Sequence, residues 1–222
     1  MDLPGHGLTR APENFTNYDD ILGAVLAFID HLLPGQRFAV VGMSAGGHVA
    51  RGLVHKRAQS LTGVMFNAAA MQPLYAQRQL PDHVAIREDS DFAAAAGDAA
   101  DKIRDLQPVC DVAMAGWYHR NLVPARALMQ EPFASNSWRS ENYPFSFAVH
   151  PLAQPFEEPS LILCGRQDTV VGYRDAIPLI EDYPRATFAT LDLGGHILQP
   201  ARPDLFRALV VDWLDRVSPE GT

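Results

Sequence analysis

The stretch VVGMSAGG (residues 40–47) decides how the chain is expected to fold. It contains the motif G-x-S-x-G, placed where the apolar run RFAVVG (37–42) gives way to the helical pattern SAGGHVARGLVHKR (44–57). A sharp turn between a strand and a helix exposes the hydroxyl of Ser44 and leaves the N–H of Ala45 at a helix N-terminus, ready to receive an oxyanion. The small residues that give this turn room are Gly42, Gly46 and Gly47. The motif alone arises often by chance, but a strand before it and a helix after it make the signal strong.

Short apolar runs alternate with helical patterns along the rest of the chain. The runs are RFAVVG, LTGVMFN (61–67), LILCG (161–165) and TFATLDL (187–193). Further helical patterns lie at 172–182 and 203–217. Continuous apolar strands are typical of a parallel sheet that is covered on both faces, and RFAVVG is interpreted in this way. The alternation predicts an α/β fold with an open, mostly parallel sheet, right-handed crossovers and helices on both faces.

Ahead of the motif, the stretch TNYDDILGAVLAFIDHLLPG (16–35) predicts a helix that packs along one face. Its apolar residues recur at intervals of three and four: Ile21, Leu22, Val25, Leu26, Ile29, Leu32 and Leu33. Thr16 can cap the start of this helix, because threonine is a favoured N-cap residue. The Pro-Gly pair at 34–35 then ends it.

The interval from Ala68 to Ser160 holds no convincing strand, and a gap of that length is not a simple loop. It contains the Ala-rich helical stretch DFAAAAGDAADKIRDL (91–106), and then many aromatic residues: Trp117, Tyr118, Phe133, Trp138, Tyr143, Phe145 and Phe147. We expect a single domain (1–222) with a helical lid or cap inserted at about 71–150, over the ligand-binding end of the sheet. The alternative is that these rings simply pack the insertion's own core.

A serine is a poor nucleophile without a base, and the base needs an acid to orient it. The stretch LILCGRQD places Asp168 just past one predicted strand, and LDLGGHILQP places His196 in a loop after the next. The order Ser44, Asp168, His196 brings each member to the same edge of the sheet, as in a Ser-His-Asp triad. The alternatives to catalysis are a turn residue for Ser44, a helix cap for Asp168 and a surface position for His196. Rival positions for the acid are Asp175, Asp192 and Asn67.

Four motifs in this order resemble those of the α/β-hydrolase fold superfamily, in particular its lid-bearing serine hydrolases and esterases. The motifs are DLPGHG (2–7), GMSAGG (42–47), GRQDTVV (165–171) and GGHILQPARPDLF (194–206). The resemblance implies a triad of Ser44, His196 and Asp168, with the Ala45 N–H in the oxyanion hole and no cofactor. It also implies hydrolysis of a carboxylic ester, or a related acyl bond, of a small apolar substrate through an acyl-enzyme. A serine at this turn disfavours dehalogenase and epoxide-hydrolase chemistry, which use a carboxylate there.

In the family that the chain resembles, further strands and a helix precede the DLPGHG turn. We therefore expect Met1 to be an internal position of a longer protein. The strand RFAVVG is then expected to have an open edge through which a second copy of the chain can pair. One oxyanion N–H of the family comes from the segment before this turn, so a non-catalytic or impaired binding protein stays an alternative. An acyltransferase or a carbon–carbon bond hydrolase that uses the same site is a further alternative.

The charge balance, 18 basic against 26 acidic residues for a net charge of −8, argues against nucleic acid and favours a neutral or apolar ligand. Only two cysteines occur, Cys110 and Cys164, without a CxxC pattern, which suggests neither a disulfide framework nor a thiolate metal site. The sequence has no signal-peptide pattern and no apolar run of membrane-spanning length, so a cytoplasmic protein without a membrane partner is expected.

The remaining chemistry-bearing residues receive structural interpretations. His6 belongs to the Pro-Gly turn, and His48 and His55 follow the G-x-S-x-G motif on the predicted helix, where packing or a surface position is expected. No group of residues has the spacing of metal ligands, and GMSAGG lacks the lysine of a phosphate-binding loop. No metal is expected.

Overall fold

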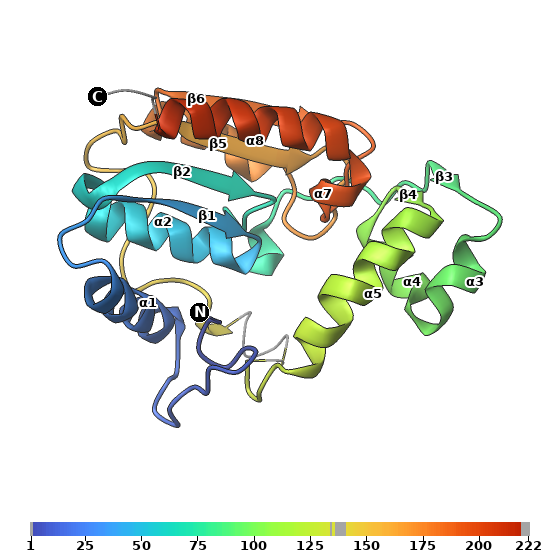
Figure 1. Ribbon diagram of the computed structural model, residues 1–222, viewed down its shortest axis with the longest axis horizontal. Helices are drawn as coiled ribbons and strands as arrows, with labels where there is room; N and C mark the ends of the chain where they lie inside the picture. The colour runs from blue at the N-terminus through green and yellow to red at the C-terminus, as the bar shows by residue number, and fades with distance from the viewer. Residues whose placement is uncertain (1, 134, 136–140, 219–222) are drawn as a thin grey trace.

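The computed structural model describes residues 2–133, 135 and 141–218. At its centre is a four-stranded parallel sheet with the order β1-β2-β5-β6. The strands are β1 (Phe38–Met43), β2 (Leu61–Asn67), β5 (Ser160–Gly165) and β6 (Ala186–Leu191). Figure 1 shows them side by side. The expected α/β fold is confirmed, and each strand begins and ends within two residues of its predicted run.

Helices cover both faces of this sheet. Helix α2 (Ala45–Arg57) packs on β1 and β2, and α1 (Tyr18–Leu32) packs against α2. Helix α8 (Pro203–Val217) packs on β5 (Figure 1). Alternate residues of the inner strands reach the two sides, because successive side chains of a strand point to opposite faces. Phe66 and Ile162 join a cluster with Ala50 and Val54 of α2. Met65 and Leu161 join a second cluster, which includes Trp213 of α8 and also residues of α1 and α2.

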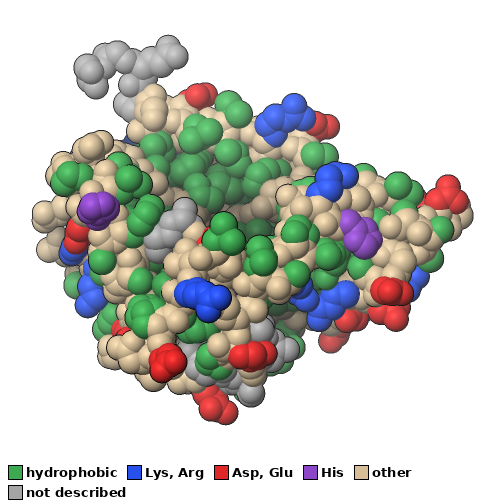
Figure 2. All heavy atoms as spheres, turned by 60° about the horizontal axis from the view of Figure 1, so that its bottom comes forward, with side chains coloured by type: hydrophobic (Ala, Val, Ile, Leu, Met, Phe, Trp, Pro, Cys, Tyr) green, Lys and Arg blue, Asp and Glu red, His purple; other side chains and the backbone are tan. Residues whose placement is uncertain are grey.

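Strand β1 lies at an edge of the described sheet and is only half covered. Phe38 and Val40 are partly buried, whereas Ala39 is exposed and Val41 is 59% exposed. The prediction that RFAVVG is covered on both faces is therefore wrong, because the helix on the second face, α8, packs on β5 rather than over β1. Figure 2 shows a broad group of hydrophobic side chains around a hollow in the upper part of the view. Pairing of this edge with a second copy stays a prediction.

The start of α1 differs from expectation by one residue. Asn17, not Thr16, is the N-cap: its side chain accepts hydrogen bonds from the N–H groups of Asp19 and Asp20. The Asp20 carboxylate accepts in return from the Asn17 N–H, which completes a capping box. The apolar face is also shorter than predicted, since Leu32 is 56% exposed at the end of the helix.

The C-terminal part of the chain completes the fold. The pattern at 203–217 forms α8 with the predicted bounds, preceded by the short α7 (Leu198–Ala201). The pattern at 172–182 forms a 3-10 helix, η4 (Arg174–Asp182), rather than an α-helix. Pro178 lies inside it, and proline cannot donate the hydrogen bond that an α-helix needs. A further 3-10 turn, η1 (Ala58–Ser60), joins α2 to β2.

The long segment between β2 and β5 contains several short helices and one longer helix, joined by irregular connections. Its elements are η2 (Tyr75–Gln77), β3 (Arg87–Glu88), α3 (Phe92–Ala96), η3 (Gly97–Ala99), α4 (Ala100–Leu106), β4 (Val109–Cys110) and α5 (Val112–Ala127). The pairing of β3 with β4 corrects the expectation of no strand in this interval, although each strand has only two residues. Helices α3, α4 and α5 lie on the side to which β1 and β2 point (Figure 1).

The aromatic residues of this segment divide between two tasks. Tyr118 packs in the segment's own core, with Phe92 and Ile103, as the alternative interpretation holds. Tyr143 and Phe145 instead stack on His48 of α2, with ring centroids 5.0 and 4.2 Å away. Trp138 lies outside the described residues. Within the described part of the chain, no helix has both the length and the apolar character needed to span a bilayer.

Candidate active site

Ser44 occupies the tight turn between β1 and α2. Its backbone has φ 51°, in the left-handed region that a non-glycine residue rarely adopts. The Ser44 N–H donates to the carbonyls of Asn67 and Ala68 at 3.1 Å each, and its own carbonyl accepts from the Ala70 N–H at 3.0 Å. The turn is therefore fastened to the end of the neighbouring strand β2, which keeps the strained conformation in place.

Two of the three glycines of the motif are required by close packing. A Cβ at Gly42 would lie 2.4 Å from the carbonyl oxygen of Gly46, and one at Gly47 would lie 2.1 Å from the Ala69 Cβ. A Cβ at Gly46 would meet no heavy atom within 4 Å. The prediction that all three supply room for the turn is thus right for Gly42 and Gly47 and wrong for Gly46.

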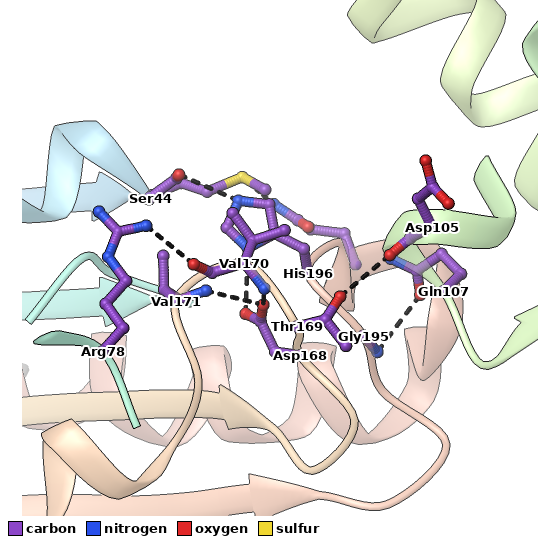
Figure 3. Close-up of polar contacts among 12 residues, drawn as sticks. Ser44, Arg78, Asp105, Gln107, Asp168, Thr169, Val170, Val171, Gly195 and His196 are labelled. Carbon is purple, nitrogen blue, oxygen red and sulfur yellow. Dashed lines mark hydrogen bonds and ion pairs between the residues drawn. The ribbon is translucent and has the colours of Figure 1, made fainter. Parts of the chain in front are cut away.

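His196 lies between Ser44 and Asp168. Its Nε2 is 3.0 Å from the Ser44 Oγ, and its Nδ1 is 3.0 Å from Oδ2 of Asp168 (Figure 3). A carboxylate next to Nδ1 favours the tautomer with the proton on Nδ1, which leaves Nε2 to accept from the serine hydroxyl. The imidazole is nearly enclosed, with 11% of its side chain exposed. The structure therefore brings together the three side chains that the sequence singles out.

Asp168 is fully buried in the loop that follows β5, three residues after the end of the strand. Its Oδ2 faces His196, and its Oδ1 accepts from the N–H groups of Val170 at 2.8 Å and Val171 at 3.1 Å. Both oxygens of the carboxylate thus have partners, as a buried charge requires. The rival acids point elsewhere: Asp175 accepts from the Gln79 N–H, and Asp192 from the side chain of Gln167.

Ala45 is the first residue of α2, directly after Ser44. The first N–H groups of a helix have no acceptor within the helix and carry its positive end. The N–H groups of Gly47 and His48 turn inward to the Ser44 carbonyl. Position and polarity therefore suit the Ala45 N–H to a developing negative charge beside the Ser44 hydroxyl.

Several residues around the site are absent from the sequence-based list. Arg78 donates to the Val170 carbonyl at 2.8 Å, and Thr169 donates its hydroxyl to the Asp105 carbonyl at 3.0 Å (Figure 3). The side chain of Gln107 accepts from the Gly195 N–H at 3.3 Å. No pattern in the sequence indicates these contacts, because most of them end on backbone groups of a segment distant in the chain.

The other three histidines singled out in the sequence have structural surroundings. His6 Nδ1 lies 3.0 Å from the carbonyl of Pro4 within the turn, and His55 stacks on Phe147. Burial, with help from Arg51, lowers the pKa of His48 to about 3, so this ring is neutral near pH 7. In the described ranges, no three His, Cys, Asp or Glu side chains gather as metal ligands.

Comparison with known proteins agrees with this architecture. A sequence profile described as "Alpha/beta hydrolase family" matches residues 1–209. An alpha/beta superfamily hydrolase from Oenococcus oeni PSU-1 matches with a TM-score of 0.89 and 21% identity, over 98% of this chain and 80% of that one. No curated protein sequence matches the chain significantly.

Two esterases also share the fold at low identity. The thermophilic esterase from Thermogutta terrifontis has a TM-score of 0.62 and 19% identity, over 97% of this chain and 78% of its own. The esterase from Exiguobacterium antarcticum has a TM-score of 0.64 and 17% identity, over 96% and 80%. With the family profile spanning nearly the whole sequence, the chain belongs to the alpha/beta hydrolase family.

Proposed function

We propose that the protein is a serine hydrolase that cleaves a carboxylic ester, or a related acyl bond, through a Ser-His-Asp triad. The observation that carries the proposal is the continuous contact from the Ser44 Oγ to His196 Nε2 and from His196 Nδ1 to Asp168, each 3.0 Å long. These are the distances at which a base can take a proton from a nucleophile and be oriented by an acid.

The reaction then follows from the order of the three groups. The Ser44 oxygen attacks the carbonyl carbon of the substrate while its proton passes to His196 Nε2. Asp168 stabilises the imidazolium that forms. The imidazolium gives the proton to the leaving alcohol, and the acyl group stays on the serine. Water repeats the sequence on the acyl-enzyme, which releases the acid and restores the hydroxyl.

The tetrahedral intermediate carries a negative oxygen that needs a donor. The Ala45 N–H, at the start of α2, supplies one such donor in our proposal. A donor of this kind lowers the activation free energy in serine hydrolases by roughly 2.7–4 kcal/mol. The helix dipole adds to its effect because the oxyanion forms at the positive end of α2.

The substrate we propose is a small or medium acyl compound of apolar character. The net charge of −8 disfavours an acidic ligand, and structural neighbours include esterases. Helices α3, α4 and α5, beyond the ends of β1 and β2, are suited to form a lid over the acyl group (Figure 1). The two buried, unpaired cysteines, Cys110 and Cys164, support a reducing compartment such as the cytoplasm.

Labelling with a fluorophosphonate tests the proposal, because this probe reacts with an activated serine. The wild-type protein should be labelled and should hydrolyse p-nitrophenyl butyrate, whereas Ser44→Ala should lose both activities. Ser90→Ala, which alters an exposed serine, is the matched control and should behave as wild type. A folded wild-type protein that is not labelled, or a Ser44→Ala variant that still is, contradicts the proposal. Product analysis with water and an added alcohol then separates hydrolysis from acyl transfer.

A further inference from the structure

The loop that carries His196 has no regular secondary structure of its own. It follows β6, and Leu193 within it has φ 60°. Two backbone hydrogen bonds of 2.9 Å tie it to the loop of Asp168: the Arg166 N–H donates to the Leu191 carbonyl, and the Gln167 N–H to that of Gly194. These bonds fix the two loops to each other. They do not fix the pair relative to the rest of the molecule.

Contacts with other parts of the chain include those from Arg78 to the Val170 carbonyl and from Arg202 to the Asp192 carbonyl. Three more come from the successive residues Asp105–Leu106–Gln107 of the inserted segment, at the end of α4; Figure 3 labels Asp105 and Gln107. The His196 N–H donates to the Leu106 carbonyl at 2.9 Å, and the Gly195 N–H to Oε1 of Gln107 at 3.3 Å. The Thr169 hydroxyl, next to Asp168, donates to the Asp105 carbonyl at 3.0 Å. Each of the three residues thus accepts one hydrogen bond from a loop that bears a member of the proposed triad.

The approach of the two segments is unusually close. A Cβ at position 195 would lie 2.1 Å from the Leu106 carbonyl oxygen, so only glycine allows the contact. Ile197, the neighbour of His196 on the other side, is fully buried in the core of the inserted segment, with Phe92 and Ile103. The histidine is therefore flanked on both sides by contacts with this segment.

Gln107 is the member of this group whose contribution comes from its side chain. The residue is 2% exposed, and its Nε2 has no hydrogen-bond partner among the described residues. Burial of an amide costs free energy unless hydrogen bonds offset it, and an apolar side chain of the same size would avoid this cost. The hydrogen bond from the Gly195 N–H to Oε1 of Gln107 offsets part of this cost.

We infer that Gln107 is a positioning residue, which holds the backbone of Gly195 so that the adjacent imidazole stays within reach of the Ser44 hydroxyl. The inference rests on the proposed function. It assigns the inserted segment a second role, since Asp105–Leu106–Gln107 then aligns the base and the acid from outside the sheet. Displacement of a reacting group by about 1 Å can cost roughly 100-fold in rate.

The test replaces Gln107 by methionine, which keeps the volume and removes the acceptor. We expect kcat for p-nitrophenyl butyrate to fall by about 10- to 100-fold. KM should change little, and the rate constant for fluorophosphonate labelling, per labelled site, should fall by the same factor as kcat. A merely structural role would lower the fraction of active protein and leave the rate constant per site unchanged. Gln77→Met, at an exposed glutamine of the same segment, is the matched control.

Gln107→Glu should recover most of the lost rate, because the carboxyl group again offers an acceptor to the Gly195 N–H. If Gln107→Met does not fold, kcat of Thr169→Val tests the inference instead. This variant loses the hydrogen bond to the Asp105 carbonyl, and we expect its kcat to fall by less than that predicted for Gln107→Met.

Wild-type rate constants in Gln107→Met overturn the inference, and so does an equal loss of kcat in Gln107→Met and Gln107→Glu. Where Gln107→Met does not fold, an unchanged kcat in Thr169→Val overturns it. A wild-type protein that is not labelled overturns the proposed function instead, and the two failures are therefore distinguishable.

Discussion

The turn that carries Ser44 and the loops that carry Asp168 and His196 are held in place in different ways. The turn joins β1 to α2 and rests on glycines within three residues of the serine. The two loops are irregular and depend on Arg78 and on Asp105–Leu106–Gln107, far away in the sequence. The position of the nucleophile is thus set by its own turn and by the neighbouring strand β2, to which the turn is hydrogen-bonded. The positions of the base and the acid depend in addition on a segment outside the sheet.

The largest expected effect concerns the loop that carries Asp168. Asp168→Asn should lower kcat by about 10⁴-fold, because an amide favours the wrong tautomer of the imidazole and cannot stabilise its charge. Steady-state kinetics with p-nitrophenyl butyrate measures the change. Asp175→Asn, at the rival acid, is the control and should retain the wild-type rate. The opposite pattern would assign the acid to Asp175.

The next effect concerns the turn that carries Ser44. Gly47→Ala places a Cβ 2.1 Å from the Ala69 Cβ and 2.9 Å from its Cα, so the free energy of unfolding should fall by about 3 kcal/mol. Urea unfolding measures this loss. The double variant Gly47→Ala/Ala69→Gly should recover part of it, since the nearest obstructing atom is then removed. Unchanged stability of the single variant would contradict the close packing of the turn.

The third effect concerns His48 of α2, which stacks on Tyr143 and Phe145 of a segment distant in the sequence. Burial lowers the pKa of His48 to about 3, from an ordinary 6.5, so the unfolded chain binds a proton that the folded protein excludes between these values. The free energy of unfolding should therefore decrease as the pH falls from about 6.5 towards 3, by up to about 1.4 kcal/mol per pH unit from this group.

His48→Phe should remove this contribution, because phenylalanine can occupy the same place between Tyr143 and Phe145 without titrating. Unfolding in urea at several pH values between 4 and 7 gives the slope of stability against pH for both proteins. The same slope in the variant and in wild type would show that His48 does not contribute.

The smallest effect is expected at Gly46, where an added Cβ meets no heavy atom within 4 Å. Alanine is favoured over glycine within a helix, so Gly46→Ala should raise the free energy of unfolding by about 0.5 kcal/mol. Urea unfolding measures this change beside that of Gly47→Ala. A marked destabilisation would mean that the turn needs all three of its glycines.

The local features are the ones that the sequence predicts well. LTGVMFN forms β2 and the pattern at 203–217 forms α8 with their predicted bounds, because an apolar run and a proline at the start of a helix act over short distances. The three candidate side chains also lie in contact, since the carboxyl ends of parallel strands meet at one edge. Their catalytic role stays a prediction.

The features that escape prediction depend on long-range or competing contacts. Thr16 and Asn17 are both good N-caps, and only the structure decides between them. The exposure of Val41 depends on where α8 lies, which its own sequence does not indicate. The contacts of Asp105 and Leu106 use backbone carbonyls, which every residue has, so no side-chain pattern can reveal them.

The two loops also differ in the strands from which they extend. Asp168 follows β5, which lies between two neighbours and has all six residues buried. His196 follows β6, which pairs on one side only among the described residues and is mostly half-buried. Edge strands exchange their amide hydrogens sooner than central strands, because local opening there disrupts fewer contacts. On warming, the histidine should therefore leave the site while β5 is still folded, so that inactivation begins before global unfolding and is reversed on cooling.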